Sequence, residues 1–342
     1  MLPPGHRPSA GALYCFWYAR GHFTEGRAVL AQVLQLPEPA GPTPGRAACW
    51  FGMDLLALAQ GDRMAAHAAA HAAWSNWQAL GRRGEESLAL RQLGILALLQ
   101  GDPDAARACF EQGLAAARAA GHPIGEGLNL WGRAQVSAYQ EAFAAAHRDA
   151  EAARACFAEV GWRRGLVNIL GFLGDLRYVQ GEPAAAQRLL EQNLALAREL
   201  GADSLSCSTL VRLGEIAVEK GDLRRAAALL RESLQASARL GDRASQAAGV
   251  AACVQLAAAG GDAQRALRLA SAAGRLRGGS AVGGPASAVR APARAREVFA
   301  RRVAAIRDSL AAGAAAGAWE EGQTLSWDAA LEEALAACEA AA

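Results

Sequence analysis

The chain has 342 residues, a formal net charge of +2 at pH 7 and a hydrophobic content of 52%. A charge balance so close to neutral gives no overall attraction to nucleic acid or to anionic membranes, so we expect direct contact with neither. The sequence also lacks a signal-peptide pattern at its start and an apolar stretch long enough to span a bilayer. We therefore expect a cytoplasmic protein.

The residue composition favours helices. Alanine and leucine dominate, aromatic residues make up only 6% of the chain, and β-branched residues are few. The seven cysteines are odd in number, scattered and never spaced as CxxC, which fits free thiols better than a disulfide framework or a zinc site. We expect an all-α fold without a cofactor.

A glycine followed by an acidic residue recurs at intervals of 40 residues, with one degenerate position and one extension towards the start of the chain. The members are Gly61-Asp62, Gly101-Asp102, Gly181-Glu182, Gly221-Asp222 and Gly261-Asp262, with Gln140-Glu141 and Gly21-His22. A second glycine series lies half a period away, at Gly81, Gly121, Gly161, Gly201 and Gly241. Two interleaved series predict one helix–turn–helix unit copied about seven times, which is an α-solenoid.

Residues 93–110 show how one unit is built. Gly94 lies in the first helix, where the missing side chain lets the second helix approach closely, and Ala106 presents the matching small surface. Phe110 then fills the space between successive hairpins. Gly101 ends the first helix, where a left-handed backbone conformation is needed. The same frame recurs over residues 173–190 and 213–230.

The order of these residues resembles the tetratricopeptide repeat. A Leu-Gly pair is followed by Gly-Asp seven residues after the glycine, by alanine five further on and by a bulky residue four beyond. The resemblance covers most of residues 11–275 and implies a non-catalytic module that binds a protein or peptide partner. Two features depart from the family: the unit exceeds the usual length of about 34 residues, and Ala97, Arg177 and Ala217 stand where an aromatic residue is expected. Peptide-clamp behaviour therefore does not transfer automatically.

The two ends of the sequence, residues 17–34 and 318–335, resemble the C-terminal sensor region of large bacterial signal-transduction ATPases. That family includes LuxR-type activators similar to the maltose-regulon activator. The resemblance implies the sensor or partner-binding part of a bacterial transcription or signalling regulator. A Walker A loop needs Gly-Lys-Ser/Thr, whereas the sole lysine, Lys220, is followed by Gly221-Asp222, so we expect no P-loop binding of ATP.

The repeat array is predicted to span residues 1–274. Residues 275–292 are rich in glycine, serine and proline, which predicts a loop. Residues 293–342 are predicted to form a C-terminal helical cap, with one helix over 293–310, a break at 313–318 and a final helix with Ser326 as its N-cap. Solenoids need such an element to cover the last open face.

Catalytic and metal-binding patterns are missing from the sequence. His67 and His71 are four residues apart and form half of a zinc pair, but no third ligand stands at a useful spacing, so we interpret them as surface histidines. No Ser/His/Asp arrangement, nucleophile elbow or glycine-rich phosphate loop is present, and we expect no enzymatic activity.

An arginine run occupies positions 290, 294, 296, 301, 302 and 307. Nucleic-acid surfaces usually interleave aromatic residues or supply a recognition helix, and only Phe299 is near this run. We expect a solvated face, or one neutralised by the acidic tail that includes Glu321 and Glu333.

The residue after each Leu-Gly pair often faces the concave groove of a tetratricopeptide array. In this frame and at neighbouring positions the candidates for partner binding are Arg91, Trp131, Gln135, Tyr139, Asn168, Asp175, Tyr178, Ser208, Glu215 and Glu219. Aromatic residues at one end and acids at the other predict a groove for an extended basic peptide. The alternative is a small-molecule effector, such as a sugar. Amphipathic helices also carry such residues on a solvated side that binds nothing.

Overall fold

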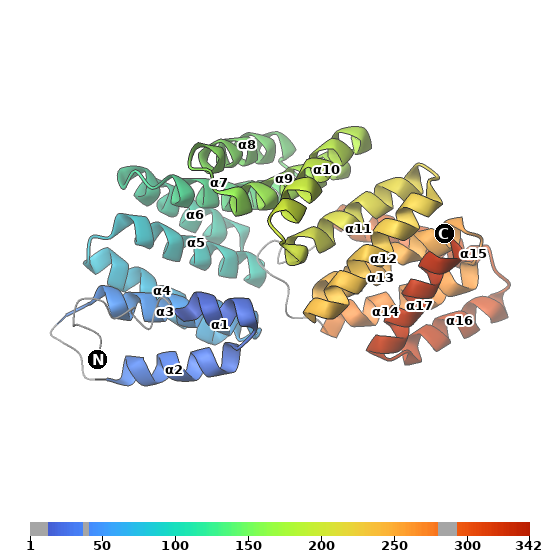
Figure 1. Cartoon of the computed structure of the whole chain (residues 1–342), viewed down its shortest axis with the longest axis horizontal. Coiled ribbons are helices and arrows are strands. Elements are labelled where there is room, and N and C mark those ends of the chain that lie inside the picture. The colour runs from blue at the N-terminus through green and yellow to red at the C-terminus, as the bar shows by residue number, and fades with distance from the viewer. Residues whose placement is uncertain (1–12, 37–40, 280–292) are drawn as a thin grey trace. The chain divides into compact units, whose positions relative to one another are not determined.

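The computed structural model describes residues 13–36, 41–279 and 293–342, and every regular element in these ranges is a helix. Successive helices pair as hairpins (Figure 1). Helices α1 to α14 make up seven of these hairpins. The predicted α-solenoid of tetratricopeptide-like hairpins is therefore confirmed. None of the described helices combines the length and the apolar character needed to cross a membrane.

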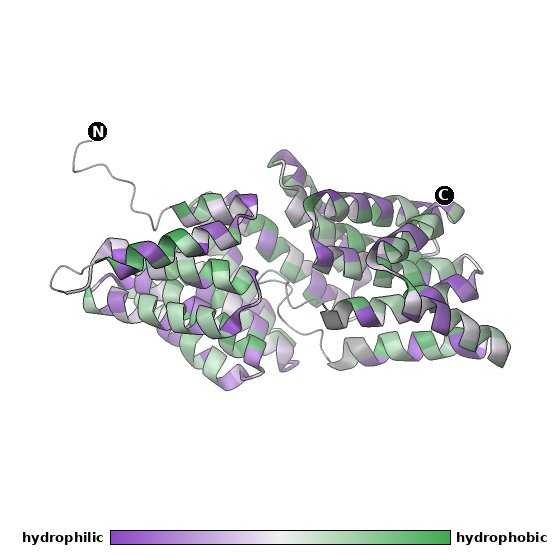
Figure 2. Ribbon diagram, turned by 90° about the horizontal axis from the view of Figure 1, so that it is seen from below, coloured by the Kyte–Doolittle hydropathy of each residue, from purple (hydrophilic) through white to green (hydrophobic). Residues whose placement is uncertain are grey.

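The described residues form two compact units, and the boundary between them lies after Trp162. The helices of the first unit are α1 (Tyr14–Arg20), α2 (Phe23–Gln35), α3 (Pro44–Ala59), α4 (Arg63–Ala79), α5 (Arg83–Gln100), α6 (Pro103–Ala119), α7 (Pro123–Tyr139) and α8 (Phe143–Glu159). Those of the second unit are α9 (Arg163–Val179), α10 (Pro183–Glu199), α11 (Asp203–Glu219), α12 (Leu223–Leu240), α13 (Arg243–Ala259), α14 (Ala263–Gly279), α15 (Ala293–Asp308), α16 (Ala312–Thr324) and α17 (Trp327–Ala340). Hydrophobic and hydrophilic residues follow one another along the helices (Figure 2), as expected of helices that pack along one stripe.

Both glycine series form left-handed turns between helices. The glycines of the two series adopt φ angles between 57° and 87°. At the degenerate position the predicted pair Gln140-Glu141 is displaced by one residue, because Glu141 takes the place of the glycine and not that of the acid. Its φ is 59°, and among the described residues it is the one non-glycine with positive φ. The acidic partner of the glycine caps the next helix: the carboxylates of Asp62, Asp102 and Asp222 accept hydrogen bonds from backbone N–H groups three residues on, at 2.9–3.1 Å. This explains why an aspartate follows the glycine in these units, whereas Glu182 makes no such hydrogen bond.

The predicted packing within each unit is confirmed, with one refinement. Gly94 makes room for Phe110 rather than for Ala106, since a Cβ atom at Gly94 would lie 2.6 Å from Cε1 of Phe110. A Cβ at Gly132 in the next hairpin would lie 2.4 Å from the same atom, so Phe110 fills the space between successive hairpins as predicted. Gly174 and Gly214 face Leu190 and Leu230 in the same way, each at 2.7 Å.

The segment after the seventh hairpin differs from its prediction in two places. Helix α14 continues to Gly279, into the segment predicted as a loop, and the rest of that segment, 280–292, lies outside the described residues. The predicted break at 313–318 is wrong, because these residues belong to α16. The alanines of this run favour helix strongly enough to offset the low helix propensity of Gly313 and Gly317. The final helix begins after Ser326 as predicted, and the Ser326 hydroxyl accepts a hydrogen bond from Ala329 N–H at 3.1 Å.

Helices α15, α16 and α17 pack onto the last hairpins of the second unit. Helix α16 approaches α14 so closely that a Cβ at Gly322 would lie 2.3 Å from the backbone oxygen of Arg268. Helix α17 contacts α12, α13 and α14. It places Cys338 with its sulfur 3.8 Å from that of Cys253, and both side chains are fully buried. As a result α13 is buried around most of its circumference, which its nearly continuous apolar sequence requires.

Candidate partner-binding site

Four predicted residues meet in the second unit, on α9 and α11, around one arginine that the sequence analysis did not single out. Arg212 Nε donates to Asp175 Oδ1 at 2.8 Å, and the same guanidinium pairs with Glu215. Its central carbon lies 4.5 Å from the centre of the Tyr178 ring. The Tyr178 hydroxyl donates to Glu219 Oε1 at 2.7 Å. We call these five residues the charged cluster.

Helical spacing explains the cluster. Asp175 and Tyr178 are three residues apart, so they share one side of α9. Arg212, Glu215 and Glu219 follow at spacings of three and four, which places them in line on α11. Half of the Asp175 side chain (48%) and a third of the Glu219 side chain (34%) remain exposed. The acids are therefore accessible to a partner.

The cluster carries excess negative charge. Three carboxylates and one guanidinium leave a charge of −2, and Arg302 of α15, whose guanidinium lies 3.0 Å from Glu219 Oε1, reduces it to −1. Burial, the charge of Glu215 and the bond to Glu219 raise the pKa of Tyr178, so its hydroxyl stays protonated and donates at neutral pH. Burial alone would lower the pKa of Arg212, but the charges of Glu215 and Asp175 raise it instead.

Two further predicted residues lie on the same sides of α9 and α11 as the charged cluster. Asn168 is half-buried and lies two turns before Asp175 on α9, while Ser208 is exposed and lies two turns before Glu215 on α11. Six of the ten predicted residues thus lie on the two neighbouring helices α9 and α11.

The other four predicted residues lie in the first unit, and the structure places two of them in the interior. Trp131 and Gln135 on α7 are each only 4% exposed, whereas Tyr139 at the end of the helix is exposed. The Arg91 guanidinium lies 5.8 Å from the centre of the Trp131 ring. α7 packs against α5, α6 and α8, which buries most sides of α7. Trp131 and Gln135 therefore do not line an open surface.

A fully buried carboxylate, Asp54 of α3, joins Arg91 through a glutamine. Gln92 Oε1 accepts from Arg91 at 3.0 Å, and Gln92 Nε2 donates to Asp54 Oδ2 at 3.1 Å. Burial raises the pKa of Asp54 to about 7, against the lowering effects of Gln92 and Arg91. Burial likewise lowers the pKa of Arg91 to about 10. We call Asp54, Arg91, Gln92 and Trp131 the buried polar cluster.

Several atoms of the buried polar cluster have no hydrogen-bond partner within the described part of the chain. These atoms are Asp54 Oδ1, Arg91 Nε and Trp131 Nε1. Buried polar atoms without partners are costly, so such groups usually meet a water or a ligand. Asp54 was missed by the sequence analysis, although a charged residue inside the apolar run from Gly52 to Ala59 is the signal that marks it.

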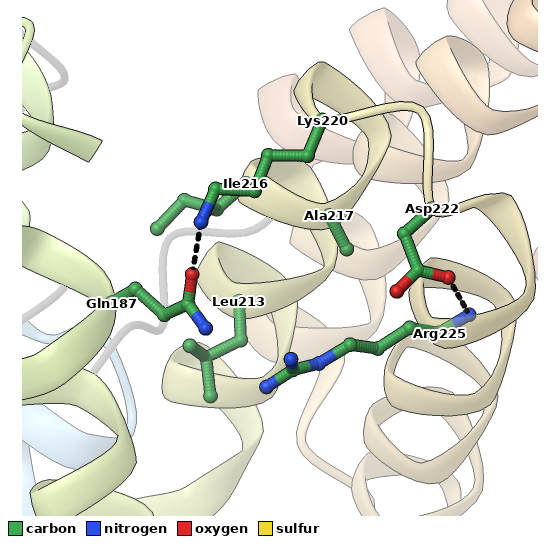
Figure 3. Close-up of a pocket in the computed structure, with 7 residues that line it drawn as sticks. All are labelled: Gln187, Leu213, Ile216, Ala217, Lys220, Asp222 and Arg225. Carbon is green, nitrogen blue, oxygen red and sulfur yellow. Dashed lines mark hydrogen bonds between the residues drawn. The ribbon is translucent and has the colours of Figure 1, made fainter. Parts of the chain in front are cut away.

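A small crevice of about 60 Å³ lies between α10, α11 and α12 (Figure 3). Its polar groups are already engaged. The Lys220 ammonium donates to Gln187, Asp222 Oδ1 accepts the N–H of Arg225 at 3.1 Å, and the Arg225 guanidinium pairs with Glu191 at 2.7 Å. The contacts of Lys220 and of the Arg225 guanidinium join adjacent hairpins, so we interpret the crevice as part of the repeat packing.

His67 and His71 share one side of α4, with ring centres 6.5 Å apart, and His71 meets the ring of Trp74 edge-on at 5.1 Å. The described residues contain no group of three or more side chains placed to hold a metal ion. A zinc site at these histidines therefore has no third protein ligand in the described part of the chain.

The acidic tail pairs with different arginines from those predicted. Glu333 and Glu321 lie 2.7 and 3.5 Å from the guanidinium of Arg268, because α16 and α17 pack onto α14 rather than along α15. Within the arginine run, Arg302 pairs with Glu219, and Arg307 stacks on Trp319 at 4.7 Å. Arg290 and the side chains of residues 294 and 296 lie outside the described residues.

Comparison with known families supports the repeat assignment for one part of the chain. Residues 165–239 match the family model of the tetratricopeptide repeat, and this range contains the whole charged cluster. A search of curated proteins found no match. Tetratricopeptide repeats commonly mediate protein–protein interaction and are typically non-catalytic. The helices from α9 to α12 are therefore similar to tetratricopeptide repeats, and the remaining hairpins have the same helical-repeat architecture.

Proposed function

We propose that the chain is a non-catalytic interaction module and that its charged cluster binds a basic segment of a partner protein. The observation that carries this proposal is the meeting of Asp175, Tyr178, Glu215 and Glu219 on the tetratricopeptide helices α9 and α11. Tetratricopeptide repeats commonly bind protein partners, and this cluster supplies a ready recognition element.

The chemistry of the cluster favours an arginine-bearing partner. Its net charge is negative, and its carboxylates accept the paired N–H groups of a guanidinium better than the single point charge of an ammonium. The Tyr178 ring already accepts the stacked guanidinium of Arg212. A partner segment with one or two arginines would add to this arrangement of alternating charges.

We further propose that this binding serves a bacterial transcription or signalling regulator, in which the chain acts as a cytoplasmic sensor or partner-binding part. The support is the similarity of residues 17–34 and 318–335 to the sensor region of signal-transduction ATPases. A test is co-expression with the regulator's output domain, followed by measurement of promoter activity with and without the Asp175→Asn substitution.

Fluorescence anisotropy with a labelled arginine-containing peptide tests the binding proposal directly. The Asp175→Asn variant should bind roughly tenfold more weakly, as expected for the loss of one charge-assisted contact. A peptide with glutamine in place of arginine should bind no better to the native chain than to the variant. The matched control is Glu232→Gln, because Glu232 is about as exposed (45%) and also pairs with an arginine, Arg198, but lies on α12. Equal binding by all three proteins would contradict the proposal.

The second candidate function is binding of a small polar effector at the buried polar cluster. The observation that favours it is the set of unpartnered atoms Asp54 Oδ1, Arg91 Nε and Trp131 Nε1, which together offer one acceptor and two donors. Isothermal calorimetry with a panel of sugars and other polyols tests it. Binding heat that disappears in Trp131→Phe, which keeps the aromatic packing but removes the N–H donor, would support the effector. Heat that is unchanged in that variant would argue against this site.

A further inference from the structure

Arg302 of α15 already sits on the charged cluster, although it lies 83 residues beyond Glu219 in the chain. We propose that α15 is an internal occupant of the partner-binding surface, and that a partner helix displaces it and puts its own arginine in the place of Arg302. This inference rests on the proposed function and adds the identity of the competing segment and the kind of partner.

The contact of Arg302 has the geometry expected of a ligand's arginine. Its guanidinium donates to Glu219 Oε1 at 3.0 Å, and the same oxygen accepts the Tyr178 hydroxyl at 2.7 Å. Burial alone would lower the pKa of Arg302, but its bond to Glu219 raises it. Arg302 therefore stays charged, and it reduces the negative charge that would otherwise attract a basic partner.

Helix α15 is held less firmly than the two helices that follow it. Among the side chains described in α15, only Val303 is buried, with Phe299 and Ile306 partly buried. By comparison, α16 buries Ala315, Ala318 and Gly322, and α17 buries four residues. The Arg302–Glu219 pair is substantially exposed on both sides (40% and 34%), and exposed ion pairs contribute little to stability. Helix α15 can therefore leave while α16 and α17 stay in place.

The sequence of α15 describes the partner that would replace it. Phe299, Val303 and Ile306 follow one another at spacings of four and three, which forms an apolar stripe along one side of the helix. Arg302 stands beside this stripe. A partner that fits the same surface is an amphipathic helix of another protein, with apolar residues at i, i+4 and i+7 and an arginine at i+3.

The test uses the full chain and a labelled peptide with the sequence of α15, residues 293–308. Its affinity is measured by fluorescence anisotropy for the native chain and for the variants Arg302→Ala, Glu219→Gln and Arg301→Ala. Arg301 is the matched control because it is the adjacent arginine and is exposed. If α15 covers the cluster in about nine molecules out of ten, Arg302→Ala should lower the apparent Kd up to about tenfold, because apparent affinity scales with the binding-competent fraction. Arg301→Ala should leave it unchanged, and Glu219→Gln should weaken binding.

Hydrogen–deuterium exchange of the α15 amides gives a second readout that needs no peptide. Arg302→Ala and Glu219→Gln should each speed exchange in α15 but not in α17, and addition of the peptide to the native chain should do the same. Circular dichroism checks that each variant keeps its helical content.

Two results would overturn the inference, and they are distinguishable. If the native chain binds the peptide in a Glu219-dependent way but Arg302→Ala neither tightens binding nor speeds α15 exchange, then α15 is not an occupant and the proposed function stands. If no protein binds the peptide, Arg302→Ala included, then the proposed function itself fails for this class of partner, and the inference fails with it.

Discussion

Gly94 and Phe110 touch so closely across the α5–α6 hairpin that a Cβ atom on Gly94 would lie 2.6 Å from Cε1 of Phe110. Phe110 is 1% exposed and cannot move aside, because Gly132 of the next hairpin confines the same edge of its ring. We predict that Gly94→Ala lowers the free energy of unfolding by about 2 kcal/mol, the usual cost of overpacking a core. Urea denaturation followed by circular dichroism measures this loss.

The control for that substitution is Gly274→Ala in α14. Gly274 is exposed, and a Cβ atom there would meet nothing within 4 Å. Alanine should therefore stabilise the helix by about 0.5–1 kcal/mol through its higher propensity. Equal effects of the two substitutions would show that helix propensity, and not contact with Phe110, decides the outcome.

Glu141 holds a left-handed conformation with φ 59°, in the turn between α7 and α8 where the other repeats have glycine. We predict that Glu141→Gly raises the free energy of unfolding by about 1 kcal/mol, because glycine adopts this conformation without the steric cost that a Cβ imposes. The reverse change at an equivalent turn, Gly101→Glu (φ 84°), should destabilise by a similar amount. Thermal melts of both variants measure the shifts, and a loss of stability in Glu141→Gly would refute the prediction.

Asp54 makes stability depend on pH in a predictable direction. Its folded-state pKa of about 7 lies above the ordinary value of 3.8, so the folded protein holds the proton more tightly than the unfolded chain does. The sign follows: this contribution to stability is full below about pH 4 and is lost as the pH rises towards 7. A shift of this size corresponds to roughly 4 kcal/mol.

We therefore predict that Asp54→Asn, which cannot ionise, matches the native stability near pH 4 and exceeds it by up to about 4 kcal/mol at pH 8. Denaturant unfolding at several pH values gives the difference. Asp104→Asn, at an exposed position in the first turn of α6, is the control and should show no such trend. A constant difference across the pH range for Asp54→Asn would contradict the assignment.

Arg133 and Asp149 join α7 to α8 by two hydrogen bonds, of 2.7 and 2.9 Å, and the Asp149 side chain is only 5% exposed. Removing the arginine leaves the buried carboxylate with only a 3.8 Å contact to the exposed Arg148, so Arg133→Ala should cost about 3 kcal/mol. Arg154→Ala, which removes an exposed pair with Glu151, should cost less than about 0.5 kcal/mol. Urea denaturation measures the loss of unfolding free energy in each variant. Similar losses would show that the buried pair contributes no more to stability than the exposed pair.

The turns and hairpins were predictable because each depends on a few local residues. Left-handed glycines at fixed spacing mark the ends of helices, and Phe110 marks the space between hairpins. The break predicted at 313–318 failed because two glycines in an alanine-rich run do not end a helix that is supported by packing against α14. Helix boundaries that tertiary contacts decide are not visible in local sequence.

The charged cluster was predictable in part. The repeat frame selected Asp175, Tyr178, Glu215 and Glu219, because residues at helical spacing share one side of a helix. Arg212 was missed because the selection of neighbouring positions did not include the residue directly before the Leu-Gly pair. Arg302 was recognised only as one of several arginines, because its contact with Glu219 depends on how α15 folds back onto the array. Burial of Trp131 likewise depends on neighbouring helices and not on its own position in the unit.

The burial of Cys253 against Cys338, 85 residues later, has a consequence for biosynthesis. Helix α13 leaves the ribosome long before α17 does, so its apolar side must wait for a covering helix while the intervening residues are translated. During this interval the nascent chain exposes an apolar helical surface, which is prone to aggregation until α17 covers it. Maturation of the second unit is thus tied to completion of translation through α17, whereas its earlier hairpins can form as they emerge.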